Sequence, residues 1–265
     1  MPACHGACST GTPDARVEAM ASRSAWVALI LVSAGCQLEG EPAATGPSLA
    51  AKIQAAQARM HERFGSAQRI EQAIAHSDLE RARIEARSLA ENTEPEVLPR
   101  WRPYLEGIGR AAHRIDRAAD VVAAAKATAV LGRECARCHE AMAAKITFPV
   151  QPRPSDDARL APQMLGHQWA AARMWEGLIG SANDRWLEGA QALTQVPLTI
   201  VAEEPMTASL RNSTRADGDN IGDDVARVRL YANRAVASHN LDARAEIFGE
   251  LLATCVHCHA VIRDR

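Results

Sequence analysis

Two copies of one short motif carry the chemistry that this sequence can perform: Cys135-Ala136-Arg137-Cys138-His139 and Cys255-Val256-His257-Cys258-His259. Two cysteines separated by two residues and followed by histidine form the attachment pattern of a c-type haem. On a helix the second cysteine and the histidine lie three and four positions after the first cysteine, so the three side chains share one face. Each copy therefore predicts one covalently bound haem. The predicted thioether residues are Cys135, Cys138, Cys255 and Cys258, and the predicted iron ligands are His139 and His259.

Three other uses of paired cysteines fit less well. A zinc ribbon places its two pairs roughly 15–20 residues apart, whereas these motifs begin 120 residues apart. A thioredoxin-like redox pair needs a strand–helix–strand setting, but the flanks 123–133 and 241–254 are Ala-rich and helical in pattern. A structural disulfide leaves the histidine unexplained in both copies. Haem is the interpretation that uses every residue of both motifs.

Composition favours packed helices and gives no sign of a nucleic-acid partner. The 265 residues are 47% hydrophobic but only 4% aromatic, and the formal net charge is −2, so a basic excess is lacking. Residues 49–150 carry 16 basic and 13 acidic side chains, and residues 151–265 carry 12 and 15. Opposite net charge can orient two halves on each other or on a redox partner protein, although scattered solvated charge is the simpler interpretation.

The first 36 residues are expected to be an export leader, with Met20 as the better start. The apolar run Ala25–Val32 is too short to span a bilayer and has the length of a signal-peptide core. Ser33-Ala34-Gly35-Cys36 resembles a bacterial lipoprotein cleavage box, which implies lipidation of Cys36 and a membrane anchor; simple secretion to the periplasm stays open. Residues 37–48, rich in Pro, Gly and Ala, are expected to be a tether.

Apolar periodicity and capping residues predict an all-α protein with two groups of four helices. A proline-rich linker at 148–160 separates a first domain, 49–147, from a second, 161–265. Asn183 and Asn240 are predicted helix caps, and Val196–Asp219 is a predicted loop. The predicted helices are 49–75, 79–91, 103–115, 121–145, 164–180, 184–195, 221–238 and 241–262.

The two halves look like copies of each other. At an offset of 104 residues Met60 aligns with Met164, and at an offset of 120 the two cysteine motifs align. The loop Val196–Asp219 accounts for the difference between the two offsets. An internal duplication explains this matched order.

A c-type haem motif at the end of a fourth helix resembles the class II cytochromes c, the cytochrome c′ family. The resemblance rests on Leu131–His139, on Phe248–His259 and on the four-helix plan of each half, and it covers residues 49–145 and 160–263. It implies two tandem four-helix bundles, each with haem on its last helix. A tandem pair departs from the usual single bundle, so the family's dimer formation and gas binding transfer weakly.

The start of the first helix of an antiparallel bundle lies beside the end of the fourth, so a residue there can ligate the iron from its far side. Met60 is the candidate for the first haem, and Met164 is its repeat partner for the second. Thioether with imidazole is a known cytochrome ligand pair, although both methionines can equally be core residues. His167 follows Met164 by three residues and is the alternative ligand of the second haem. His61 and His76 are expected to be surface residues.

These expectations describe an exported dihaem c-type cytochrome that carries one electron at a time and performs no enzymatic reaction of its own. A five-coordinate haem protein that binds nitric oxide or carbon monoxide is the alternative. A dihaem peroxidase or reductase is a third, and it needs an open iron with a polar far side, for which His167 is the candidate.

Overall fold

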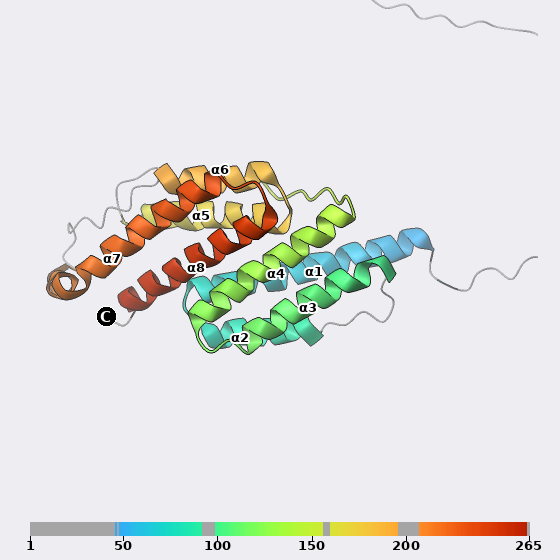
Figure 1. Ribbon diagram of the computed structural model, residues 1–265, viewed down its shortest axis with the longest axis horizontal. Helices are drawn as coiled ribbons and strands as arrows, with labels where there is room; N and C mark the ends of the chain where they lie inside the picture. Colours follow the sequence, from blue (N-terminus) through green and yellow to red (C-terminus); the bar gives the residue numbers. More distant parts are fainter. Residues whose placement is uncertain (1–45, 47, 92–98, 156–159, 196–206, 264–265) are drawn as a thin grey trace, which may run out of the picture. The chain divides into compact units, whose positions relative to one another are not determined.

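The computed structural model describes residues 46, 48–91, 99–155, 160–195 and 207–263, and within them the chain is helical without strands (Figure 1). This confirms the predicted all-α class. The predicted leader, with Met20 and Cys36, lies outside the described residues. The helices are α1 (Leu49–Ala75), α2 (Leu79–Glu91), α3 (Arg102–Asp116), α4 (Val121–Ala141), α5 (Leu160–Ile179), α6 (Asn183–Gln195), α7 (Thr207–Val236) and α8 (Leu241–Arg263), with the 3₁₀ turn η1 (Pro99–Trp101) before α3.

Polar side chains cap the first turn of four helices. Oxygens of Ser48, Asp78, Asp120 and Asn240 each accept a hydrogen bond from the backbone N–H three residues later, over 2.7–3.2 Å. Each bond satisfies a donor that the helix itself leaves unpaired. The predicted cap at Asn240 is confirmed. The predicted cap at Asn183 is wrong, because this residue is already the first of α6 and its amide oxygen accepts instead from the Arg244 guanidinium at 2.5 Å.

Two predicted helix boundaries also differ from the structure. Helix α4 ends at Ala141 rather than Lys145, because Ala143 takes a φ of 50° and its N–H bonds back to the carbonyl of Glu140, which closes the helix. Helix α7 begins at Thr207, so much of the predicted loop 196–219 is helical. That stretch is rich in Asp, Asn, Thr and Gly, which are weak helix formers, and its sequence therefore did not indicate a helix.

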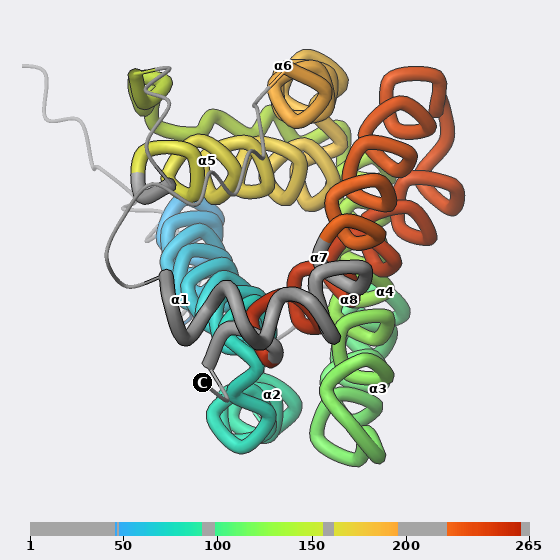
Figure 2. The backbone as a smooth tube through the Cα atoms, turned by 90° about the vertical axis from the view of Figure 1, so that its left-hand side faces the viewer, coloured from blue at the N-terminus to red at the C-terminus, as the bar shows by residue number. Residues whose placement is uncertain are grey.

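Each helix contacts the next one along the chain within α1–α4 and within α5–α8, and the most extensive contact between these two groups is α4 against α8. In Figure 2, α5 and α6 lie at the top of the view and α2 and α3 at the bottom, with α1, α4 and α8 between them. Residues 48–265 form one compact unit. Inside the predicted linker, Phe148 is buried and its ring lies 5.6 Å from that of Phe64 on α1. The division into two domains stays a prediction.

Helices α4 and α8 run antiparallel where they cross. Arg133 and Arg137, late in α4, each donate to the Asp242 carboxylate at the start of α8 over 3.0 Å. Lys126, earlier in α4, pairs with Glu250, later in α8, at 2.7 Å. Basic residues of the first half therefore meet acidic residues of the second, as their opposite net charges allow.

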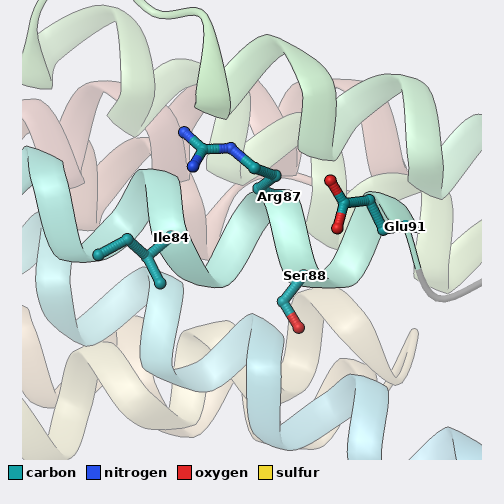
Figure 3. A pocket seen from close by; sticks show the side chains of 4 residues that line it. All are labelled: Ile84, Arg87, Ser88 and Glu91. Atoms are coloured by element: carbon teal, nitrogen blue, oxygen red, sulfur yellow. The ribbon is translucent and has the colours of Figure 1, made fainter.

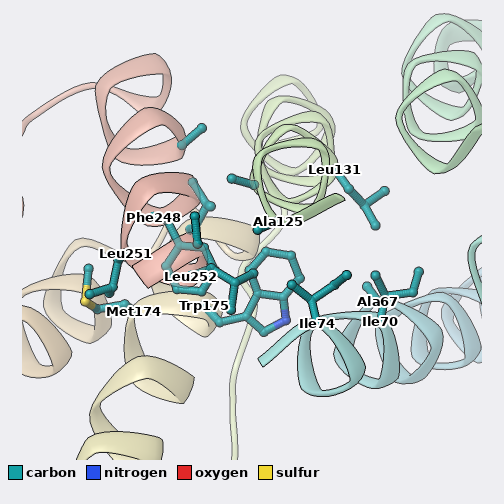
Figure 4. Packing of buried hydrophobic residues seen from close by; sticks show 14 of the residues in the cluster. Ala67, Ile70, Ile74, Ala125, Leu131, Met174, Trp175, Phe248, Leu251 and Leu252 are labelled. Carbon is teal, nitrogen blue, oxygen red and sulfur yellow. The ribbon is translucent and has the colours of Figure 1, made fainter. Parts of the chain in front are cut away.

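Aromatic rings fill the centre of the core. The indole of Trp175 on α5 stacks on Phe248 of α8, with ring centroids 5.3 Å apart and planes 21° apart (Figure 4). Gly132 of α4 leaves room for it, because a Cβ at that position would lie 2.6 Å from the indole. Stacked rings of this kind contribute about 0.5–1.5 kcal/mol beyond the area that they bury. The core thus joins α4, α5 and α8 one turn before the first cysteine motif.

Candidate functional site: two Cys-Cys-His clusters

The first cysteine motif lies in the last two turns of α4. Cys135, Cys138 and His139 are three and four residues apart on a continuous helix and therefore share a face, as predicted. Cys138 is buried, the other two residues are half-buried, and both thiols are free. This spacing places the two thiols and the imidazole on the same side of α4.

The second motif has the same arrangement in α8. Cys255, Cys258 and His259 are all half-buried, and both thiols are again free. Its intervening residue His257 is exposed and contacts the buried Asp224 of α7, with Nδ1 and the carboxylate 2.6 Å apart. Asp224 also accepts from Arg227 at 2.8 Å. This pair ties the second motif to α7.

Burial keeps the four thiols protonated. It raises the pKa of Cys135 and Cys255 to about 12 and shifts the pKa of Cys138 and Cys258 upward. The Arg63 guanidinium lowers the pKa of both thiols in the first motif, though burial outweighs it. Nucleophilic or metal-ligating cysteines depend on the thiolate, so these are not activated redox cysteines in the conformation described.

Each iron-binding candidate has one ring nitrogen already occupied. Nδ1 of His139 lies 2.8 Å from the carbonyl of Ile179, and Nδ1 of His259 is hydrogen-bonded to the carbonyl of Ala75. A carbonyl can only accept, so Nδ1 carries a proton in both rings. Burial lowers the pKa of His139. Its imidazole is therefore neutral at pH 7, with Nε2 as the nitrogen left for a metal.

Charged residues that the sequence did not single out surround the motifs. Arg63 on α1 is buried and acts on both thiols of the first motif. Glu71, two turns further along α1, is buried beside the second motif, and burial raises its pKa to about 7. His76, expected at the surface, is exposed, but its ring stands edge-on to that of His259 at 5.9 Å. Nothing local in the sequence marks these residues, because their neighbours come from other helices.

The candidates for the far side of each iron lie on α1 and α5. Met60, Met164 and His167 are half-buried, and His61 is exposed. The Nε2 atom of His167 is buried without a hydrogen-bond partner, and burial, with a smaller contribution from Arg229, lowers the pKa of this histidine to about 4. His167 therefore offers a neutral, unpaired nitrogen. Their role as ligands stays a prediction.

At the offset of 104 residues His167 takes the place of Arg63. Arg63 lies within electrostatic range of Cys135 and Cys138, so the matching position on α5 is the one expected to approach the second motif. The two halves thus carry different side chains at this matched position, a guanidinium on α1 and an imidazole on α5.

An open hollow on the outer surface of α2 lies apart from both clusters (Figure 3). Ile84, Arg87, Ser88 and Glu91 line it, all from the one helix. Arg87 is engaged with the Asp116 carboxylate at 2.9 Å, which raises the pKa of the guanidinium. We assign it no function.

Comparisons with known proteins return no match: no family model fits the chain, and no curated protein and no solved structure is similar to it. Within the described residues, no group of three or more His, Cys, Asp or Glu side chains is arranged to hold a metal ion by itself, and no helix is long and apolar enough to cross a membrane.

Proposed function

We propose that the chain is a dihaem c-type cytochrome that exchanges single electrons with a redox partner protein. The observation that carries this proposal is the state of the two histidines: His139 and His259 both have Nδ1 bonded to a carbonyl, which leaves Nε2 for iron beside two free thiols. Such a second bond orients the ring and raises its basicity as a metal ligand. Haem supplies the redox chemistry, and the protein sets its potential and solvent access.

The proposed architecture is a pair of four-helix bundles of the cytochrome c′ kind, α1–α4 and α5–α8, each with haem on its last helix. The contacts between successive helices support it, as do the matched positions of the motifs in α4 and α8. A duplicated bundle accounts for two haem sites built by the same local sequence.

The spacing of the motifs is consistent with two haems at separate ends of the molecule. Helix α4 crosses α8 near Ala129 and Gly249, six residues before the first cysteine of each motif. Because the helices are antiparallel and rise about 1.5 Å per residue, Cys135 and Cys255 are offset by about 18 Å along the crossing. An electron can therefore enter at one end and leave at the other.

The proposed location is the bacterial periplasm, with the chain either free or anchored by a lipid on Cys36. The leader-like segment before Cys36 supports this. Covalent haem attachment to such motifs needs reduced thiols, and the four cysteines of the two motifs are free.

Haem content tests the proposal directly. Expression in a host with a cytochrome c maturation system should add two haem masses to the denatured protein. The paired variants Cys135→Ala/Cys138→Ala and Cys255→Ala/Cys258→Ala should each remove one of them. A haem-free product from this host, or zinc held by these cysteines, would contradict the proposal.

The resting optical spectrum then separates electron transfer from gas binding. Two low-spin haems fit a carrier whose irons are six-coordinate. High-spin haem at either site, with reversible binding of carbon monoxide, would favour the five-coordinate gas-binding function that the family resemblance also implies.

A further inference from the structure

We propose that each half of the chain orients the iron-binding histidine of the other half, so that each haem is tuned across the molecule; this inference rests on the proposed function. The histidine on α4 is held by the end of α5, and the histidine on α8 is held by the end of α1. The repeat is therefore not two independent sites but a reciprocal pair.

The crossed hydrogen bonds occupy equivalent positions in the two halves. Ile179 is the last residue of α5 and Ala75 the last residue of α1. Their carbonyls accept from Nδ1 of His139 and of His259, respectively. Ala75 and Ile179 are 104 residues apart, and the histidines are 120 apart, which are the two offsets of the duplication. Both copies of the contact thus follow the same pattern.

The turn that ends each of these helices makes a second crossed contact. Ser77, with a φ of 59°, and Ser181, with a φ of 50°, each occupy the left-handed region. The Ser77 hydroxyl donates to the carbonyl of Val256, inside the second motif, at 3.0 Å. The Ser181 hydroxyl donates to the Glu140 carboxylate, next to the first histidine, at 2.5 Å. Each serine lies two residues from the carbonyl that holds the histidine and fixes that turn against the motif.

The contact between α4 and α8 explains why the exchange is reciprocal. Gly249 packs on Ala129, and these residues are equivalent in the repeat, 120 positions apart. A contact between equivalent positions is the signature of a two-fold interface, in which whatever one half supplies to the other it also receives. The single chain therefore has the contacts of a symmetric dimer.

The hydrogen bond affects the metal through the imidazole. A Nδ1–H···O=C bond gives the ring partial anionic character, so Nε2 donates more strongly and stabilises oxidised iron. Weakening the bond should raise the reduction potential of that haem. The affected haem is the one in the opposite half of the chain from the mutation, and the upward direction of the shift is the one expected for a weakened hydrogen bond to the ligating imidazole.

A pair of substitutions in the full-length, haem-loaded protein tests this crossing. Ser77→Val places a β-branched residue at positive φ and should shift the end of α1, and Ser181→Val does the same for α5. Ser77→Val should raise the potential of the second haem and move its hyperfine-shifted proton signals, leaving the first haem unchanged. Ser181→Val should do the reverse.

Milder variants keep the test decisive if valine disturbs folding. Ser77→Gly and Ser181→Gly relieve the backbone and remove only the hydroxyl contact, so they should give smaller shifts at the same opposite haem. Asparagine tolerates positive φ, so Ser77→Asn should keep the backbone geometry that Ser77→Val disturbs. A shift at the haem of the mutated half, or no shift at either haem with all four valine and glycine variants, would overturn the inference.

The haem-free protein supplies a readout that does not depend on the proposed function. Nitrogen-15 spectra of the histidine rings should show His139 and His259 protonated on Nδ1, and Ser77→Gly should perturb His259 alone. If these spectra agree but the protein takes up no haem in a maturation host, the proposed function fails while the crossed contact stands. Protonation of either ring on Nε2 would contradict the contact itself.

Discussion

Gly249 of α8 packs directly on Ala129 of α4, and a Cβ at Gly249 would lie 3.3 Å from the Ala129 Cβ. Packing this close leaves no space for a larger side chain where the two helices cross. Gly249→Val should therefore lower the free energy of unfolding by about 1–3 kcal/mol through overpacking. Urea denaturation of the haem-free protein measures the change.

Gly109 provides the matched control for this substitution. It lies in the interior of α3, and a Cβ added there would have no other atom within 4 Å. Gly109→Val should leave stability nearly unchanged, because valine is the slightly better helix former. Equal losses at both positions would show that the close contact at Gly249 does not limit packing.

Glu71 should make the stability of the haem-free protein depend on pH. Burial raises its folded-state pKa from 4.5 to about 7, so the folded state retains a proton that the unfolded chain releases. The contribution of this proton to the free energy of unfolding is fully present below pH 4.5 and is lost as the pH rises through about 7. The shift corresponds to about 3 kcal/mol. Denaturation between pH 4.5 and 7.5 should show it.

Glu71→Gln isolates this contribution, since the amide keeps the shape of the protonated acid and cannot ionise. The variant should lose less stability than the unaltered protein as the pH rises. Other buried acids, such as Glu176, whose pKa burial also raises, contribute equally to both proteins and cancel. Identical pH profiles for the two proteins would mean that Glu71 is ionised in the folded state.

The helices were predictable because their signals are local. Helices α1 and α2 match the predicted ranges 49–75 and 79–91 residue for residue, since apolar periodicity and the capping residues act within a few turns. The crossing of α4 and α8 was not predictable, because alanine and glycine at Ala129 and Gly249 leave no distinctive pattern. Opposite net charge in the two halves was the available hint.

The site, like the fold, was predictable only where its signals are local. The spacing of each motif was enough to place its cysteines and histidine on one helical face. The partners of those residues come from other helices, as Arg63, Glu71 and Asp224 do, so their roles depend on tertiary packing. One signal was available in the sequence: the repeat aligns Arg63 with His167, so a role near the first motif for one makes the other a candidate near the second.

Met60 is predicted to be the sixth ligand of the first haem. It precedes Arg63 by one turn on α1, and Arg63 acts on both thiols of the first motif, so the two side chains face the same way. Met60→Ala should turn one haem high-spin, lower its potential and abolish its weak thioether charge-transfer band in the deep red. His61→Ala, one residue away and exposed, should change none of these. A spectrum unaffected by Met60→Ala would leave this methionine as a core residue.

The second haem has two candidate ligands one turn apart, and their substitutions give different spectra. If the His167 imidazole is the ligand, His167→Ala should turn the second haem high-spin. If the Met164 thioether is the ligand, Met164→Ala should turn it high-spin and also remove a deep-red absorption band. The Nε2 of His167 is buried without a hydrogen-bond partner, and the pKa of about 4 keeps this imidazole neutral at pH 7, as an iron ligand must be. Redox titration adds a second criterion, because bis-histidine haem has a lower potential than haem with a methionine ligand. If neither substitution changes the spin state, the second iron is five-coordinate, and carbon monoxide should bind to it without displacing a ligand.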